Sequence, residues 1–452
     1  MKMDSNLSER EQIDEWYENH ERGSAVWGDD GGRTGMRPLL IMFLLCMITG
    51  CSVEKQAQYV PAETISAEPG YTEPDTLEGT GRSEHGVLTA EDGYPLTGGQ
   101  EEIIFAYMER YYESLSLLKV QDLEDLFGTE AKENLELNRS AWEYVIGLRA
   151  MQKTDLKLDS YQYELTVEEF RQKRDGELSV RLKEHNIQRF AQHPDIDSEF
   201  YNIHHTFLLV QEAEGWRIRE HLQDDGIYQN IMGTYRNGES RLVPENEDFF
   251  QSQKTALLKQ AREQLQGRYG AGREISFPKA RYGYDREAAA AYAENWVGKR
   301  NEVWDDFTGQ GGNCQNFVSQ CLYAGGIPRD ITGEQVWSFR KKDTDMPENQ
   351  VNTDSWINVN EFRRYATDNY RYGLAALPDA PYLEGEVGDV IQMGFPGNWS
   401  HTVLITGVIK DEQGNVLDYL VDSNTADLKH FPVSAYSLPC QSLVKVYGWN
   451  EW

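Results

Sequence analysis

The chain of 452 residues has few positive charges: 44 Lys and Arg stand against 75 Asp and Glu, for a formal net charge of −31. A nucleic-acid partner needs clustered Lys and Arg to neutralise its phosphates, so the composition argues against nucleic-acid binding. Cysteine is also scarce, with five in all, and no paired Cys/His spacing typical of a zinc site occurs. The sequence therefore gives no indication of a metal centre.

Long apolar runs are missing as well. The run 39–48 has ten residues, which is too short to span a bilayer but suits the apolar part of a signal peptide. It leads into Ile48-Thr49-Gly50-Cys51, which resembles a bacterial lipobox with Cys51 as the lipidated first residue of the mature protein. Residues 1–51 are thus predicted to be a lipoprotein leader, in which the first 35 residues are either structure or an over-long start. The alternative for residues 39–50 is a buried helix or strand.

Lipid on Cys51 would hold the protein at the outer face of the bacterial cell membrane. Residues 52–99 mix Pro, Glu, Thr, Ser and Gly with few large apolar side chains, a composition that cannot bury enough surface to fold. We therefore expect a disordered tether there.

Residues 100–240 are predicted to form a separate α+β unit. Apolar residues first follow helical spacing, at Ile104, Met108, Tyr111, Tyr112, Leu115 and Leu118, and a second helical stretch covers 142–151. The period then changes to two, as in Leu178, Val180 and Leu182 after the turn residues Asp175-Gly176. Helices followed by a curled antiparallel sheet resemble the cone-shaped SnoaL-like fold. Residues 241–280 are polar and favour a helical connector.

The adjacent His204 and His205 lie on an expected strand of this unit, so they face opposite sides and cannot both bind one metal. We expect each to be packed or solvent-facing.

The last region, 281–452, carries the chemistry. Its glycine-rich turn Gly311-Gly312-Asn313 delivers Cys314 to the start of an amphipathic helix, where the helix N-terminus favours a thiolate and lowers a cysteine pKa. Only His401 and His430 lie beyond residue 281. His401 begins an apolar, β-branched strand, whereas His430 lies in a charged loop. The predicted pair is therefore Cys314 as nucleophile and His401 as proton acceptor.

A third group should orient the imidazole of His401. The strand ending Asp422-Ser423-Asn424 places Asp422 and Asn424 on one face, and either could reach His401, with a structural strand end as the alternative. The backbone N–H of Cys314 is the natural first donor to an oxyanion, and Gln310 is a candidate for the second.

Four segments of this region resemble the putative bacterial amidase domain family, which is related to the NlpC-type and CHAP cysteine hydrolases. They are 311–328, 355–359, 388–391 and 400–403, in the family order. The resemblance implies a papain-like fold, with the third member of the site at Asn424, where the family commonly has histidine. One departure is Asn313, because the family usually has Asp directly before its cysteine.

Three further residues complete the predicted site region. Trp399, two residues before His401, is a candidate for the substrate wall. Cys321 and Cys440 either form a disulfide, which would leave Cys314 free, or remain two separate buried thiols.

The sequence as a whole predicts a membrane-anchored, extracytoplasmic cysteine amidohydrolase that needs no cofactor. The family implies peptide amide bonds of the cell wall, in peptidoglycan, as its substrate. Two alternatives stay open at this point: a non-catalytic wall-binding lipoprotein, and an acyltransferase that uses the same Cys-His chemistry.

Overall fold

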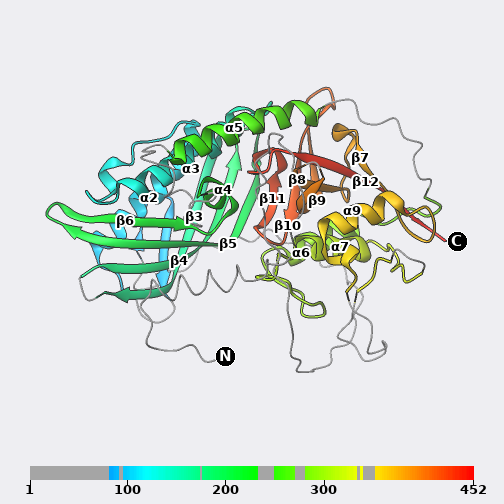
Figure 1. Cartoon of the computed structure of the whole chain (residues 1–452), viewed down its shortest axis with the longest axis horizontal. Helices are drawn as coiled ribbons and strands as arrows, with labels where there is room; N and C mark the ends of the chain where they lie inside the picture. The colour runs from blue at the N-terminus through cyan, green and yellow to red at the C-terminus, as the bar shows by residue number, and fades with distance from the viewer. Residues whose placement is uncertain are drawn as a thin grey trace, which may run out of the picture.

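The computed structural model describes residues 81–90, 95–173, 176–232, 249–269, 280–332, 336–339, 352–395 and 397–451. The predicted leader 1–51, with Cys51, lies outside these residues. The described chain is a mixed α and β structure built on one large mixed sheet of twelve strands (Figure 1).

The N-terminal half of the described chain has two long helices, a set of long strands and a third long helix. Its elements are β1 (Gly81–Arg82), β2 (Gly86–Ala90), α2 (Gly98–Leu117), η1 (Glu124–Leu126), α3 (Lys132–Ala150), β3 (Leu158–Gln172), β4 (Leu178–Phe190), β5 (His193–Glu212), β6 (Gly215–Gln223), α4 (Gly226–Met232) and α5 (Phe249–Arg268). The change from helical to strand periodicity near residue 155 is therefore confirmed. The helix predicted in the connector is α5.

The C-terminal half has short helices followed by five strands and a final long strand. Its elements are α6 (Arg286–Trp296), α7 (Cys314–Ala324), α8 (Asp354–Ile357), α9 (Val359–Asp368), β7 (Gly373–Ala380), η4 (Tyr382–Glu384), β8 (Val390–Phe395), β9 (Asn398–Lys410), β10 (Val416–Ser423), β11 (Asp427–Pro432), η5 (Val433–Ala435) and β12 (Gln441–Asn450).

Both halves contribute to the same sheet. The strand order is β1-β2-β3-β4-β5-β11-β10-β9-β8-β12-β7, with β6 paired to β5. All pairs are antiparallel except β2 with β3. The halves meet where β5 pairs with β11, with Tyr201 opposite Asp427 and Glu199 opposite Lys429. The two regions that the sequence separates are thus joined by backbone hydrogen bonds.

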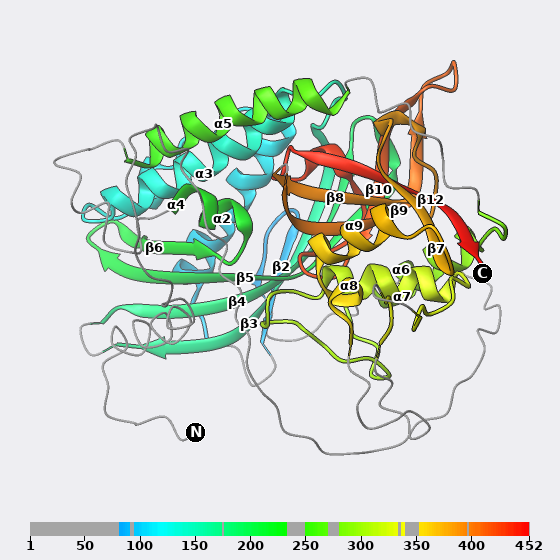
Figure 2. The ribbon, with the colours of Figure 1, turned by 45° about the vertical axis from the view of Figure 1, so that its right-hand side comes forward.

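The two faces of the C-terminal strands are buried against different partners. On one face, Val403, Ile405 and Val421 belong to the same apolar cluster as the helices of the N-terminal half. On the other face, Leu404 and Val444 pack in a second cluster with α6, α7 and α9. Figure 2 shows α6 to α9 together beside strands β7 to β12, with α5 lying along α3. The strand alternation that produces these two faces also decides which residues meet the start of α7.

The prediction of a disordered tether is wrong for part of residues 52–99. Residues within 52–99 form β1 and β2, and α2 begins at Gly98. β2 extends the sheet by pairing in parallel with β3 and antiparallel with β1, and its Leu88 is fully buried. Few large apolar side chains suffice here, because the backbone of β2 is held by hydrogen bonds to its neighbouring strands.

No helix among the described residues is long and apolar enough to cross a membrane.

Candidate active site

Cys314 is the first residue of α7, as the sequence predicts. The turn before it requires glycine, because Gly311 and Gly312 have φ of 100° and 101°, in the left-handed region. A Cβ on Gly312 would also lie 3.4 Å from the side chain of Thr425, so the turn packs closely against the loop after β10. The backbone N–H groups of the first turn of α7 have no acceptor within the helix, and they surround the thiol.

Asn313 fastens this turn to the rest of the site. Its backbone N–H donates to Thr425 Oγ1 at 2.6 Å, and its Nδ2 donates to Asn424 Oδ1 at 2.8 Å. Its own Oδ1 accepts from Asn316 Nδ2 at 2.8 Å and from the backbone N–H of Phe307 at 3.2 Å. The side chain is buried, so these bonds fix the position of the residue directly before the thiol.

His401 lies near the start of β9, opposite Met393 of β8. The backbone of the next residue, Thr402, is close enough to Cys314 to lower the pKa of its thiol. Both side chains are almost enclosed, with exposed fractions of 5% for Cys314 and 8% for His401. Both predicted catalytic residues are therefore buried in the region where the start of α7 approaches the start of β9.

Burial dominates the electrostatics of this region. It raises the pKa of Cys314 to about 11, against the backbone N–H groups of Thr402, Gln315 and Cys314, which lower it. It lowers the pKa of His401 to about 4. The predicted lowering of the cysteine pKa is thus wrong for the resting state, because loss of hydration outweighs the helix N-terminus. Burial therefore favours the uncharged form of both the thiol and the imidazole.

The side chain of Asn424, the favoured third residue, forms its hydrogen bonds with other groups. Besides accepting from Asn313, it donates from Nδ2 to the carbonyls of Trp296 and Lys299, each at 3.1 Å. These three bonds use the amide to hold the turn before Cys314 against the loop after α6. In this structure the side chain of Asn424 supports the turn before Cys314, and its hydrogen bonds do not involve His401.

Asp422, the rival for that role, is fully buried and lies opposite Leu404 of β9. Its Oδ1 accepts from Thr406 Oγ1 at 2.9 Å and from the backbone N–H of His430 at 2.8 Å. Its Oδ2 has no hydrogen-bond partner within the described chain, and burial raises its pKa to about 6. One oxygen of this carboxyl group is therefore free to accept a further hydrogen bond.

The two remaining predicted site residues, Gln310 and Trp399, have different surroundings in the structure. Gln310 is exposed in the turn before Gly311, and its backbone N–H donates to the Phe307 carbonyl at 2.9 Å. Trp399, in contrast, shares a small buried cluster with Cys314 and Val359, and its backbone is held by Asn360. It is in place to form a wall beside the thiol.

Cys321 and Cys440, the other cysteines among the described residues, are free. Cys321 is buried on α7 and Cys440 is half-buried, so the disulfide considered from the sequence is absent and both thiols are separate. Cys440 packs against the cluster of Cys314, Val359 and Trp399.

His430 and His204 have structural partners. His430 is paired with Glu294 at 3.3 Å. His204 and His205 do face opposite sides, because His204 meets Glu168 at 3.0 Å near the surface while His205 is buried.

His205 belongs to a polar network that the sequence analysis missed. It contacts Glu184 at 2.8 Å and His221 at 3.1 Å, and His221 continues to Asn138 at 2.7 Å. Each of these ring nitrogens has a partner, so the network reads as a satisfied core. Within the described ranges, no three or more His, Cys, Asp and Glu side chains are grouped so as to hold a metal ion.

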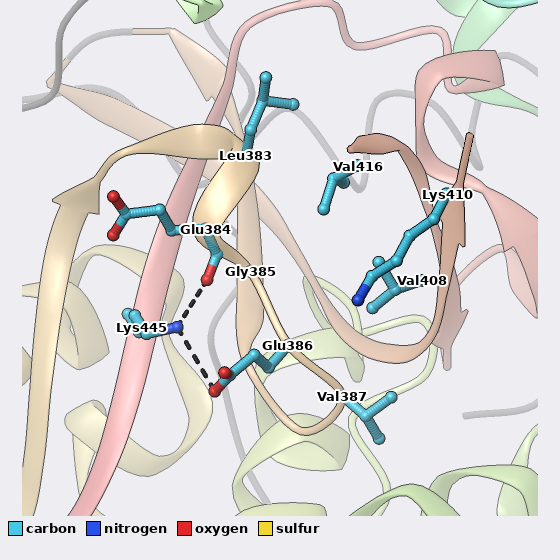
Figure 3. A pocket seen from close by; sticks show the side chains of 9 residues that line it. All are labelled: Leu383, Glu384, Gly385, Glu386, Val387, Val408, Lys410, Val416 and Lys445. Atoms are coloured by element: carbon cyan, nitrogen blue, oxygen red, sulfur yellow. Dashed lines mark hydrogen bonds and ion pairs between the residues drawn. The ribbon is translucent and has the colours of Figure 1, made fainter. Parts of the chain in front are cut away.

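A separate surface hollow lies at η4 and the β9–β10 hairpin (Figure 3). Lys445 donates there to the Glu384 carbonyl at 2.5 Å and pairs with Glu386 at 3.4 Å. None of the predicted catalytic residues lines this hollow, so it contributes nothing to the chemistry at Cys314.

Residues 283–448 match the family described as "Putative amidase domain". The match indicates an amide-bond hydrolase. The chain is also 26% identical over 231 residues to a protein of Bacillus subtilis (strain 168) named "Uncharacterized protein YhbB", covering 50% of this chain and 65% of that protein. The chain thus spans less than two thirds of this relative. No solved structure matches the chain.

Asn313 and Asn424, which the sequence analysis compared with the family pattern, are in direct contact, with a hydrogen bond of 2.8 Å between their side chains. The sequence alone gave no sign of this contact.

One residue beside His401 gave no sequence signal. Tyr436 follows η5 and lies with its ring centroid 5.6 Å from that of His401. It belongs to no motif, and only the path of the chain between β11 and β12 brings it here.

Proposed function

We propose that the chain is a cysteine-dependent amidohydrolase in which Cys314 attacks the carbonyl carbon of an amide. The observation that carries the proposal is the position of Cys314: it is buried at the first residue of α7, and the backbone of Thr402, the residue after His401, is close enough to lower the pKa of its thiol. The amidase family match over residues 283–448 supports the reaction class.

The reaction follows from the resting protonation states. As the sulfur bonds to the carbonyl carbon, its proton passes to His401, and negative charge builds on the carbonyl oxygen near the N–H groups at the start of α7. His401 then gives the proton to the amine, which leaves, and the acyl group stays on sulfur as a thioester. Water, deprotonated by His401, hydrolyses the thioester and restores the thiol.

We propose peptidoglycan peptides as the substrate and the outer face of the cell membrane as the location. The family implied by the motifs around Cys314 and His401 supports the first. The lipobox-like residues 48–51 support the second.

The chemical proposal is tested with isolated peptidoglycan, by mass spectrometry of the fragments released by the native chain and by Cys314→Ala. Loss of the nucleophile should lower cleavage by a factor on the order of 10³ or more. Cys321→Ala is the matched control, because it makes the same change on the same helix but within the apolar core. Equal cleavage by the native chain and Cys314→Ala would refute the thiol mechanism.

The anchor is tested independently, by lipid labelling and membrane fractionation of bacteria that produce the native chain or Cys51→Ala. We expect label and membrane association with the native chain and neither with the variant. A variant that stays labelled would rule out Cys51 as the lipidated residue.

A further inference from the structure

The loop 424–427, which connects β10 with β11, has a strained backbone although it contains no glycine. Thr425 has φ of 109° and Ala426 has φ of 47°, both in the left-handed region. For a β-branched residue such as threonine this conformation is a genuine outlier. Strain of this kind persists only where the surroundings hold it, and it gathers at functional sites.

This strained loop contacts the turn that precedes Cys314. The Oγ1 atom of Thr425 accepts from the backbone N–H of Asn313 at 2.6 Å. The Oδ1 atom of Asn424 accepts from the side chain of the same residue at 2.8 Å. The residue directly before the nucleophile is thus held twice by one loop, so the shape of the loop determines where the turn lies.

Asp427 fixes the shape of the loop. Its carboxylate accepts from the backbone N–H of Thr425 at 3.1 Å and from Nη1 of Arg300 at 3.1 Å. Only 5% of the residue is exposed, and hydrogen bonds to an ionised group are stronger than neutral ones. The backbone of Asp427 belongs to β11, where it lies opposite Tyr201 of β5. The loop is therefore tied to the ladder that joins the two halves of the described chain.

Asn202 of β5 brings the N-terminal half into this arrangement. Its Nδ2 donates to Oδ2 of Asp427 at 2.8 Å and to the carbonyl of Gly298 at 3.3 Å. The carbonyl of the next residue, Lys299, accepts from Asn424 at 3.1 Å. One side chain of the N-terminal half thus contacts both segments that hold the turn before the thiol.

The contact between the halves is also close at Gly298. Its φ is 73°, and a Cβ there would lie 2.9 Å from the ring of Tyr201. The ring of the N-terminal half therefore rests directly on the backbone of this segment, beside the hydrogen bond from Asn202.

We propose that Asp427 is a positioning residue for Cys314 and that the N-terminal half takes part in the site through Asn202. Asp427 holds the strained loop in the shape in which Thr425 and Asn424 both fasten the turn before the thiol. Asn202 in turn fixes the carboxylate of Asp427. This inference rests on the proposed role of Cys314 as the nucleophile, so its first test does not require turnover.

The test follows backbone hydrogen exchange in the full-length chain, by mass spectrometry of overlapping peptides that contain Asn313. The variants are Asp427→Ala and Asn202→Gly, and glycine keeps the φ of 58° at residue 202 without strain. We expect the Asn313 amide to exchange about 10-fold faster in each variant, because the turn opens locally. Exchange in β4 should stay unchanged, whereas a general loss of stability would raise both.

Lys429→Met is the matched control. It breaks the contact of Lys429 with Glu199 at 2.7 Å, in the same pair of strands, but that contact has no link to the loop. Exchange of the Asn313 amide should therefore stay native. If Asp427→Ala fails to fold, Asn202→Gly decides the question, because residue 202 is exposed.

Native exchange of the Asn313 amide in Asn202→Gly would overturn the proposal. So would an equal rise in β4, or a rise of the same size in Lys429→Met.

The role in the reaction is measured on a soluble peptide amide that the native chain cleaves. Asp427→Ala and Asn202→Gly should lower kcat about 10-fold and change KM by less than about twofold, because the thiol and not the bound peptide is displaced. A native kcat in both variants would overturn the proposal. A chain that cleaves no amide yet shows the local rise in exchange would refute the proposed function and leave standing the role of Asp427 in holding the turn.

Discussion

At the scale of single residues, burial favours the uncharged forms of both the Cys314 thiol and the His401 imidazole. Cys314 and His401 are each less than a tenth exposed, and burial moves their pKa values away from the charged states. The energy for charge separation must therefore come from the bound substrate and from groups that stabilise the imidazolium ion.

Asp422 should make stability depend on pH. Its pKa rises from an ordinary value near 4 to about 6 on folding, so the folded chain holds this proton more tightly, and ionisation above pH 6 costs free energy. Asp422→Asn should therefore be more stable than the native chain at pH 7.5, by about 2 kcal/mol, and the difference should vanish as pH falls to 4. Urea unfolding at several pH values measures this. A difference that does not change with pH would contradict it.

Asn424→Ala separates two roles that the sequence could not distinguish. The change leaves the Asn313 amide and two backbone carbonyls without partners, and we expect a loss of about 2–4 kcal/mol in the free energy of unfolding. Asn424 holds the turn and not the imidazole of His401. The pH at the midpoint of Cys314 alkylation by iodoacetamide, followed by mass spectrometry, should therefore stay unchanged. A stable variant with a shifted midpoint would restore Asn424 as the residue that orients His401.

The residues with local signals were the predictable ones. Cys314 and His401 could be found because each stands at the junction of a polar turn with a regular element. Asn424 and Asp422 were correctly placed on one strand end, but their hydrogen-bond partners come from loops far away in the chain. Tyr436 could not be found, since its position depends on how η5 packs and not on any pattern around it.

At the scale of elements, strand β12 shows how closely the backbone packs behind the site. Gly448 has φ of 134°, and a Cβ there would lie 1.9 Å from the carbonyl oxygen of Tyr282, which forms a bridge with Trp449. Only glycine allows this approach. The segment 280–283 is thereby fixed to the sheet just before α6 begins.

Gly448→Ala should accordingly destabilise the chain by roughly 3 kcal/mol or more, since the new methyl group meets backbone that cannot move aside cheaply. Gly414→Ala is the control: its φ of 84° is also positive, but its surroundings are open, so about 1 kcal/mol is expected from backbone strain alone. Thermal unfolding of both variants makes the comparison. Equal losses of stability in the two variants would show that the contact with Tyr282 adds nothing to the cost of Gly448→Ala.

The helices and strands themselves were largely predictable from the sequence, while the pairing of the strands was not. Alternating Leu178, Val180 and Leu182 predicted a half-buried strand, and they are fully or almost fully buried in β4. The pairing of β5 with β11 joins residues more than two hundred positions apart, and no periodicity within either strand specifies its neighbour.

At the scale of the whole molecule, the catalytic region is not self-contained. One face of its sheet shares an apolar cluster with the N-terminal helices, and its strand β11 is covered by β5. Expressed alone, residues 281–452 would expose both a row of unpaired backbone groups and apolar side chains such as Val403 and Val421.

The isolated fragment 281–452 should therefore aggregate or unfold, whereas the full chain should unfold in one cooperative transition. Calorimetry of the full chain and size-exclusion chromatography of the fragment test this. A soluble, folded fragment with its own transition would show that the two halves are independent.

The β5–β11 ladder also limits what the molecule can do mechanically. Linked domains usually swing about a flexible joint, so that an enzyme at one end samples many orientations relative to the other. A shared sheet provides no such joint. The orientation of the Cys314 thiol relative to Gly81, where the described chain begins, is therefore fixed. A ligand held in an extended polymer would have to arrive in the right orientation, because the enzyme cannot turn its catalytic end to meet it.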